Sequence, residues 1–431
     1  MSALPAGPDL PAAVQTVALA RDPIGVLSRC RGRYGPVFSL DLRFAGPTVV
    51  IGDHDLAEPL LEGDGAIAHA GAARRRVLPQ ASAGSSFGAD EERHRQLRAR
   101  IAPALAAERL EAQRDGIAEV AARQIEAWPD RGPILLLSRM RSIAEEVFVR
   151  YVLGVVSDTR AARIAATVGR VLRTPGNPPL TPPDRDHPLG KVVDAVLRWR
   201  LRPLVEPIDL ALRERRHVNP QGDTILDVLA ADPTVSAEEA IDELLVVMAA
   251  AQEPAAIAMT WLTMELSRDD RLRERFCTAA PGSDTRRAIV DEVVRLYPPA
   301  LAALRVLTEE REIGGHRFPA GTGVMVAIPL VHRDPGSFPD PLRLEPGRFA
   351  GTDRPPAFMP FGGGPRRCPG EDLARLELDV IVPAVLDHVE LRLPPRRERP
   401  VQRATVLPPN RSGLAFVQSS SRMPAGSRPS G

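Results

Sequence analysis

The chain is poor in cysteine and in lysine. Its 431 residues include only three cysteines, Cys30, Cys277 and Cys368, which are too few and too widely spaced for a disulfide framework or a four-ligand zinc site. Lys191 is the only lysine, and acidic residues balance the arginines to a net charge of +1, so the basic footprint of a nucleic-acid-binding protein is missing. Any functional cysteine must act alone, and no nucleic acid is expected as a partner.

Long hydrophobic runs are missing as well. The most apolar stretch, residues 244–251, is far shorter than the roughly 20 residues that cross a bilayer, and the first residues lack the layout of a signal peptide. We therefore expect a cytoplasmic protein without a membrane anchor. With 44% hydrophobic and 26% charged residues the chain is expected to fold, as a single domain over residues 1–417 with a disordered tail over 418–431.

Two regions show the patterns of strands. Apolar residues alternate at Phe38, Leu40 and Leu42, and a turn at residues 45–47 leads into a second apolar run, which predicts a hairpin. Residues 312–328 also look strand-like, so we expect a β-rich lobe over about 34–60 and 310–330.

The remaining sequence is mainly helical. The helical pattern runs over residues 89–231, broken by a proline-rich surface loop at 174–188, and further helices are expected to end near Tyr297 and to begin at about Gly370. A capping box at Ser236 and Glu239 starts a helix that extends to about Arg268, roughly 50 Å at 1.5 Å per residue. Its middle is apolar nearly all round, which indicates burial on every side.

Residues 361–370, Phe-Gly-Gly-Gly-Pro-Arg-Arg-Cys-Pro-Gly, form the most informative segment. Glycines allow the backbone to approach a flat ring closely, and the helix expected after Cys368 would lower the pKa of its thiol. Arg366 is placed to bind a carboxylate of a cofactor. Read from the residues alone, three alternatives stay open: a phosphate loop, although the Lys-Ser/Thr ending is missing; a cysteine nucleophile, although no histidine is assigned to it; and a turn with an incidental buried cysteine.

The same segment resembles the signature of the cytochrome P450 family, Phe-x-x-Gly-x-Arg-x-Cys-x-Gly. It matches at every defined position, namely Phe361, Gly364, Arg366, Cys368 and Gly370. The resemblance implies haem b as cofactor, with Cys368 as the axial ligand of the iron. It also implies the family's fold, which is mainly α with a small β lobe, a triangular helical prism with a long central helix over the haem.

Further family motifs follow in the expected order. Glu292 and Arg295, at i and i+3, resemble the family's structural pair that joins a later arginine, here Arg348. His94 and Arg98 resemble the pair whose side chains bind the haem propionates, and Arg305 resembles a third propionate-binding residue. For each charge taken alone, an exposed position on an amphipathic helix is the simpler interpretation.

The central helix departs from the family pattern. The family's Ala/Gly-Gly-x-Asp/Glu-Thr motif aligns with residues 250–254, where Glu253 keeps the acid but Pro254 replaces the threonine that helps deliver protons. Proline has no N–H, so we expect a bend and an open acceptor at the carbonyl of Ala250. Proton delivery then falls to water near Glu253 or Gln252, to a group on the substrate, or to the use of peroxide.

The resemblance implies a monooxygenase that inserts one oxygen atom from O2 into a hydrophobic small molecule, such as a terpenoid or polyketide intermediate. Electrons would come from a ferredoxin and its reductase, attracted by Arg366, Arg367 and Arg375. Substrate contacts are expected from four segments, 77–87, 174–188, 247–253 and 300–304. Two alternatives are a haem-thiolate enzyme that uses peroxide or catalyses coupling, desaturation or rearrangement, which Pro254 favours, and a non-catalytic haem sensor or binding protein.

Overall fold

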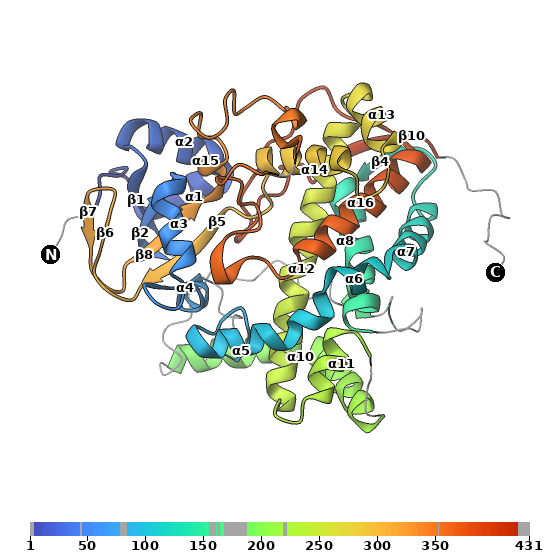
Figure 1. Ribbon diagram of the computed structural model, residues 1–431, viewed down its shortest axis with the longest axis horizontal. Helices are drawn as coiled ribbons and strands as arrows, with labels where there is room; N and C mark the ends of the chain where they lie inside the picture. The colour runs from blue at the N-terminus through green and yellow to red at the C-terminus, as the bar shows by residue number, and fades with distance from the viewer. Residues whose placement is uncertain are drawn as a thin grey trace.

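The computed structural model describes residues 4–43, 45–77, 84–154, 161, 164–167, 188–218, 222–351 and 353–420. The predicted proline-rich loop at 174–188 lies outside these residues except for Pro188, which begins a helix. Over the described residues the chain is mainly helical with small sheets, as the sequence predicts (Figure 1).

A five-stranded sheet forms the β-rich lobe. Its strand order is β1-β2-β8-β5-β3, and β2 and β8 run parallel although they come from opposite ends of the chain. The predicted hairpin is confirmed, since Phe38 pairs with Val50 and Leu40 with Thr48. The lobe draws on more of the chain than predicted, because two of its strands lie outside the expected ranges. The expected ranges also contain part of a helix. The strands are β1 (Val37–Leu42), β2 (Gly46–Ile51), β3 (Ala68–His69), β5 (Ala302–Leu307) and β8 (Gly323–Ala327), with a separate ribbon of β6 (Arg311–Ile313) and β7 (His316–Phe318).

The two faces of this sheet belong to different hydrophobic clusters. Along β2, Val49 and Ile51 join the main core, whereas Val50 between them joins a smaller cluster with Leu27. This alternation follows from the period of two in a strand, and it makes the sheet a wall shared by both clusters. The surrounding helices are α1 (Ala12–Arg21), α2 (Pro23–Tyr34), α3 (His54–Glu62), α4 (Ala70–Val77) and α15 (Ile328–Val331).

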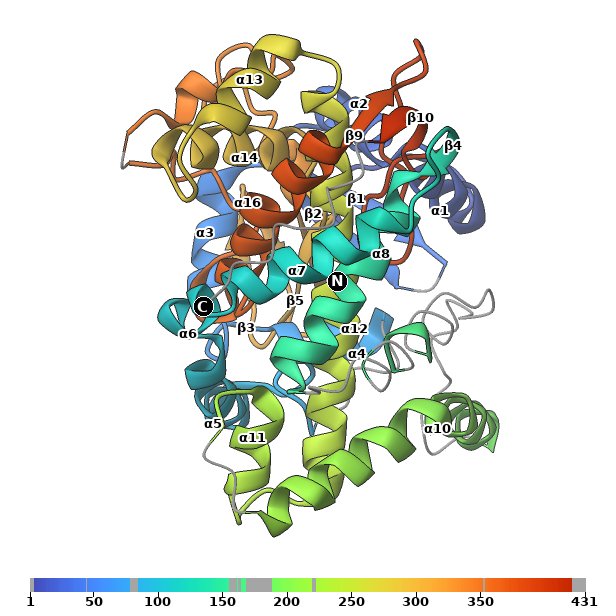
Figure 2. The same ribbon diagram turned by 90° about the vertical axis from the view of Figure 1, so that its right-hand side faces the viewer.

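Helices make up the other side of the molecule (Figures 1 and 2). The longest helices are α10 and α12, with 30 residues each. The helical segments are α5 (Glu91–Ile101), η1 (Ala102–Leu105), α6 (Ala107–Glu111), α7 (Arg114–Glu126), α8 (Leu136–Val147), the π-helical turn η2 (Phe148–Val152), α10 (Pro188–His217), α11 (Ile225–Ala231), α12 (Ala237–Leu266), α13 (Asp270–Thr278), α14 (Asp284–Leu296), η3 (Pro346–Phe349), η4 (Gly364–Arg366) and α16 (Glu371–His388).

Helix α12 passes through the middle of the fold (Figure 2). The predicted capping box is confirmed, with the Ser236 hydroxyl accepting from the Glu239 N–H and the Glu239 carboxylate accepting from the Ser236 N–H. The helix continues through Pro254 without interruption, and every residue from Ala255 to Leu266 is buried. Among the described residues α12 alone has the length and hydropathy of a membrane span, and 56% of that window is buried inside the protein, as in a core helix.

A second sheet was not predicted. Its order is β4-β10-β9, formed by β4 (Gly132–Leu135), β9 (Val389–Arg392) and β10 (Leu414–Ser420). The expected tail boundary at residue 418 is wrong, because Ser419 and Ser420 still pair with Glu390 and Val389 across a β-bulge. Residues 421–431 lie outside the described part of the chain.

Candidate functional site

The cysteine loop is held tightly between η4 and α16. Gly364 adopts a φ of +61°, and a Cβ atom there would lie 2.1 Å from the carbonyl oxygen of Leu61 in α3. The N–H of Cys368 donates to the carbonyl of Phe361 at 2.9 Å, which closes the loop. The glycine at 364 is therefore required by both conformation and close approach.

Cys368 is an exposed residue and lines a hollow of about 450 Å³. Burial by the surrounding atoms raises the pKa of its thiol, and the N–H of Gly370 and the charge of Arg98 only partly offset this. The expected lowering of the pKa is thus wrong for the protein groups alone. Metal coordination deprotonates a thiol outright. The hollow is lined by Arg98, Ala102, Leu105, Arg367, Cys368, Pro369, Glu371 and Asp372.

Two of the predicted cofactor-binding arginines share buried carboxylates. Arg366 contacts Asp64 (Nε to Oδ2, 2.5 Å) and Asp90 (Nη2 to Oδ1, 2.9 Å), while Arg305 contacts Asp64 (Nε to Oδ1, 3.1 Å). The side chains of Arg305, Arg366 and Asp64 are each only 2% exposed. Sequence reasoning missed both carboxylates. Asp90 had a signal, because it directly precedes a helix, but nothing local marked Asp64.

His94 and Arg98 lie within the same electrostatic environment. Burial, followed by the charge of Arg366, lowers the pKa of His94 to about 4, so its ring is neutral at pH 7. Arg98 donates from Nη2 to the carbonyl of Arg367 at 2.7 Å. Arg74 of α4, which sequence reasoning did not select, also interacts electrostatically with Arg366 and with Cys368.

These residues fit a haem. The region holds four guanidinium groups, those of Arg74, Arg98, Arg305 and Arg366, but among the described residues only two carboxylates, Asp64 and Asp90, form ion pairs with them. A cationic surplus at a buried place favours a ligand with anionic groups, and the two carboxylates of haem supply them. The thiol of Cys368 supplies the ligand that iron requires.

A buried ion pair lies behind the cysteine loop, as predicted. Glu292 and Arg295 are both 0% exposed and join at 2.6 Å (Oε2 to Nε), and Arg348 approaches the other oxygen of Glu292 at 3.4 Å. The backbone N–H of Glu345 donates to the same oxygen at 2.7 Å. The three predicted residues are therefore together, and they fix the chain that leads to the loop.

His332 extends this arrangement and was missed by sequence reasoning. Its Nδ1 contacts the carbonyl of Arg295 at 3.1 Å, and its Nε2 accepts from the N–H of Met359 at 3.0 Å. The ring stacks on Phe358, and burial lowers its pKa to about 3. A neutral imidazole with Nδ1 protonated satisfies both contacts, so His332 connects the buried ion pair to the residues just before the cysteine loop.

The central helix presents different groups on its two sides. Ala249 and Ala250 are exposed in the middle of this core helix, whereas Gln252 lies on the buried side with Leu244 and Met248. Residues two positions apart on a helix point about 200° apart, so Gln252 does not share a face with Ala250 or Pro254.

Glu253 is engaged in an ion pair. Its carboxylate forms a bidentate pair with Arg141 of α8, with Nε to Oε2 at 2.6 Å. Of the three residues predicted at the distal site, the structure therefore leaves Pro254 on the same side as Ala250, Gln252 on the opposite side, and Glu253 bound to a cation. No hydroxyl is available at 254 or 255.

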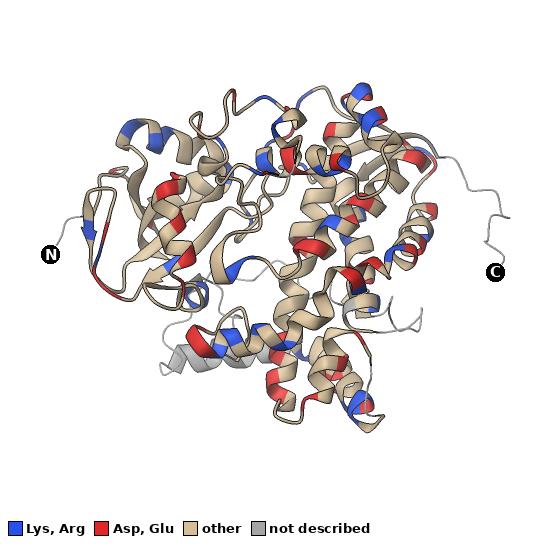
Figure 3. Cartoon of the chain, in the orientation of Figure 1, with Lys and Arg blue, Asp and Glu red and all other residues tan. Residues whose placement is uncertain are grey.

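The predicted arginine patch for an electron donor is mostly wrong. Arg366 is buried, and Arg375 is 18% exposed, because its Nη1 contacts Asp291 at 2.8 Å and its Nε contacts Glu371 at 3.0 Å. Arg367 is 51% exposed and pairs with Glu371. Basic and acidic residues are mixed over the helices in view (Figure 3).

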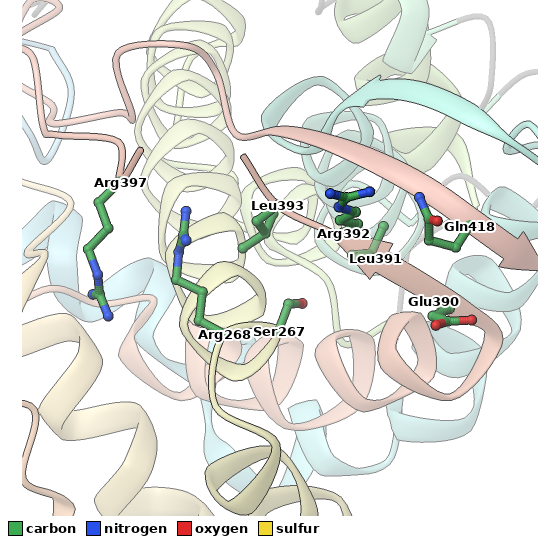
Figure 4. A pocket seen from close by; sticks show the side chains of 8 residues that line it. All are labelled: Ser267, Arg268, Glu390, Leu391, Arg392, Leu393, Arg397 and Gln418. Atoms are coloured by element: carbon green, nitrogen blue, oxygen red, sulfur yellow. The ribbon is translucent and has the colours of Figure 1, made fainter. Parts of the chain in front are cut away.

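A second hollow of about 560 Å³ lies elsewhere, at the end of α12 beside β9 and β10 (Figure 4). Its lining is polar and includes Arg268, Arg392 and Arg397, but Arg397 is already paired with Glu265 and Arg268 donates to the carbonyl of Pro394. It shares no lining residue with the hollow at Cys368. This hollow is therefore separate from the cysteine site.

The predicted substrate segments are described only in part. Segment 174–188 lies outside the described residues apart from Pro188, and of segment 77–87 only the backbone of Val77 and residues 84–87 are described. Ser86 is held by Glu243 of α12, which accepts from its N–H at 2.5 Å and from its hydroxyl. Residues 302–304 belong to β5 and are partly accessible.

Known proteins resemble this chain in sequence. A family model described as Cytochrome P450 matches residues 286–416. Cytochrome P450 135B1 of Mycobacterium tuberculosis is 30% identical over 436 residues, which cover 96% of this chain and 91% of the relative. Cytochrome P450 138 of Mycobacterium bovis is 29% identical over 420 residues, 91% of this chain and 92% of that protein.

Solved structures share the fold. A cyanobacterial CYP120A1 with bound retinoic acid has a TM-score of 0.78 at 20% identity, covering 97% of this chain and 100% of that one. P450 EryK in complex with erythromycin B has a TM-score of 0.71 at 20% identity, covering 95% and 99%. Fold and cysteine loop together define a haem-thiolate protein. The chain belongs to the cytochrome P450 family, whose members bind haem and act as monooxygenases.

Proposed function

We propose that this protein inserts one oxygen atom from O2 into a hydrophobic small molecule, with haem b bound through Cys368. The observation that carries the proposal is the exposed residue Cys368 beside a surplus of buried and partly buried guanidinium groups. When bound, a thiolate-ligated haem supplies O–O bond cleavage and the oxidising chemistry. Phe361, Gly364 and Gly370 shape the loop, while His94, Arg98, Arg305 and Arg366 surround the place for the haem carboxylates.

The substrate is proposed to be apolar, of the terpenoid or polyketide kind. The accessible side of α12 carries small apolar residues, among them Val246, Ala249 and Ala250, which exclude water without adding polar contacts. The relative bound to erythromycin B is a precedent for a polyketide ligand in this fold. We also propose a cytoplasmic location and no nucleic-acid partner, as composition and charge suggest.

A ferredoxin with its reductase is the proposed source of electrons. The chain carries no flavin or nicotinamide motif, so electrons must come from other proteins. Since Arg366 and Arg375 are engaged inside the protein, Arg367 is the one arginine of the predicted patch available for steering. Ferredoxin-driven turnover is expected to fall only weakly as salt is raised from 0.05 to 0.5 M.

A second candidate function is favoured by the distal helix. Pro254 and Ala255 bring no hydroxyl, and the carboxylate of Glu253 is bound to Arg141. Proton delivery then depends on water, on a donor group of the substrate, or on peroxide in place of O2 and electrons. Coupling, desaturation and rearrangement belong to the same candidate. A haem sensor or binding protein without turnover is a third.

One series of measurements separates these functions. Reduction of the purified protein under carbon monoxide tests for thiolate-ligated haem, and Cys368→Ser must abolish the resulting absorption band. With a substrate found by a spin-state shift, product is then measured per NADPH consumed and again with peroxide alone. High yield per NADPH supports the monooxygenase, activity with peroxide alone supports the second candidate, and a spectral change without product supports the sensor.

A further inference from the structure

The buried cations beside Cys368 are not equally engaged. All three nitrogens of Arg366 are used, by Asp64, Asp90 and the carbonyl of Ser86. Arg305 contacts Asp64 through Nε and the carbonyl of Leu304 through Nη1. Both arginines therefore already have an anionic partner within the protein.

Asp64 and Asp90 are themselves fixed at the start of helix α4. Asp64 accepts from the N–H of Ala70 at 2.9 Å, and Asp90 accepts from the N–H groups of Gly71 and Ala72 at 2.6 and 2.8 Å. Together they satisfy the first three N–H groups of the helix, where negative charge is also favoured by the helix dipole. These carboxylates hold α4 against the site, and with it the residue one turn further on, Arg74.

Arg74 is partly buried and differs from the buried Arg305 and Arg366. Its Nη1 donates to the carbonyl of Phe87 at 3.1 Å, and the guanidinium lies 4.0 Å from the centroid of the Phe87 ring. In the described part of the chain no carboxylate forms an ion pair with it, and its Nε and Nη2 have no hydrogen-bond partner. Burial and the neighbouring charges of Arg366 and Arg305 lower its pKa to about 9, so it remains a cation at pH 7.

Arg98 is the second arginine without an ion-paired carboxylate among the described residues. Arg98 donates a hydrogen bond to the carbonyl of Arg367, and the carboxylate that interacts with it electrostatically, that of Glu243, is occupied by Ser86. The unmatched positive charge of the cluster therefore lies on Arg74 and Arg98. They come from two different helices, α4 and α5, that border the same buried region.

We propose that Arg74 binds a carboxylate of the haem, as a cofactor-binding residue that none of the sequence motifs marks. Arg74 then serves with Arg98, while Asp64 and Asp90 keep Arg305 and Arg366 in place. This inference rests on the proposed haem-thiolate function and adds a residue to its cofactor site.

The test separates a direct carboxylate contact from a structural role. Wild type, Arg74→Leu and Arg74→Lys are each loaded with haem or with haem dimethyl ester, whose carboxylates are blocked. Transfer of the cofactor to excess apomyoglobin is then followed by absorption. Arg76→Leu is the control, since Arg76 belongs to the same helix, is exposed and, among the described residues, donates to the carbonyl of Gly321.

Arg74→Leu is expected to lose haem about tenfold faster or more than wild type, the size of one lost charge-assisted hydrogen bond. Arg74→Lys is expected to fall between them, the dimethyl ester to leave wild type and Arg74→Leu at equal rates, and Arg76→Leu to match wild type. Equal acceleration with haem and with the ester overturns the proposal, because Arg74 then acts only through Phe87. Unchanged haem loss overturns it as well. A wild-type protein that retains no haem refutes the proposed function itself, a result distinct from both.

Discussion

At the scale of single residues, the most informative side chain outside the family motifs is His332. It is fully buried and joins the carbonyl of Arg295 to the N–H of Met359, so one ring links the buried ion pair to the approach of the cysteine loop. Because the ring is neutral, its two nitrogens take different roles, one donor and one acceptor. Neither an aliphatic side chain nor a phenyl ring supplies both the donor and the acceptor.

His332→Phe is expected to lower the free energy of unfolding by about 2–5 kcal/mol at pH 7. Phenylalanine keeps the ring stacking with Phe358 but leaves the N–H of Met359 and the carbonyl of Arg295 without partners, at about 1–3 kcal/mol each. Urea unfolding measures the difference. His217→Gln at an exposed position is the control and should change little.

The difference in free energy of unfolding between wild type and His332→Phe is expected to depend on pH. The pKa of His332 is about 3 in the folded protein and about 6.5 when unfolded, so the stability that depends on its neutral form is present above pH 6.5 and is lost as pH falls toward 3. The difference between wild type and His332→Phe should therefore shrink below pH 6.5, by at most about 1.4 kcal/mol per pH unit. A constant difference from pH 7 to pH 5 contradicts this assignment.

Glu377 is expected to make stability depend on pH in the opposite direction. Burial raises the pKa of its carboxyl to about 8, well above the ordinary value, so the folded protein holds a proton that the unfolded chain releases above about pH 4.5. Stability is full below pH 4.5 and is lost as pH rises through 8. Glu377→Gln should therefore gain stability relative to wild type as pH rises from 5 to 8, and equal pH profiles for the two proteins would refute this.

At the scale of elements, helix α12 shows what a proline in a core helix does. The helix continues through Pro254 because its second half is buried on all sides, which outweighs the loss of one backbone hydrogen bond. The sequence predicted a bend at Pro254, and the structure shows that α12 remains one continuous helix through this residue. Ala249 and Ala250 just before the proline are exposed, in contrast to the buried second half of the helix.

Pro254→Ala is expected to raise the free energy of unfolding by about 1–3 kcal/mol. Alanine restores the N–H that the carbonyl of Ala250 lacks and removes the clash of the proline ring with that carbonyl. Denaturant unfolding measures the gain, and hydrogen exchange should find the new amide at 254 protected. A less stable variant would mean that the proline relieves strain in α12.

The sequence predicted elements whose signals are local. The hairpin at 37–51 and the capping box at Ser236 follow from alternation and from two side chains three residues apart. The sheet β4-β10-β9 could not be predicted, because its strands are short and far apart along the chain. The same reason applies to Asp64 and Arg74, whose roles depend on Arg305 and Arg366, more than 200 residues away.

At the scale of the whole molecule, the shared sheet couples the two hydrophobic clusters. Val49 and Val50 are neighbours in one strand yet belong to different clusters, so neither cluster can disperse without disturbing the sheet. The order of motifs along the sequence predicted one domain but gave no information on this arrangement. Cooperative unfolding is the consequence.

Leu27→Ala, in the smaller cluster, is expected to cost about 2–5 kcal/mol, since Leu27 is fully buried. Because the clusters share the sheet, the transition should remain single. Trp128 and Trp261 lie in the main cluster, so their fluorescence and the far-UV circular dichroism should report the same midpoint. Two separate midpoints would show that the β-rich lobe unfolds independently.

The parallel pairing of β2 with β8 has a consequence for the synthesis of the protein. Thr48 pairs with Gly323 and Ile51 with Val326, so β2 emerges from the ribosome more than 250 residues before its neighbour exists. At about 5–20 residues per second that interval lasts roughly 15–55 s. During this time one edge of the apolar strand β2 is unpaired. The nascent amino-terminal lobe is therefore the part of this protein with the greatest need of a chaperone.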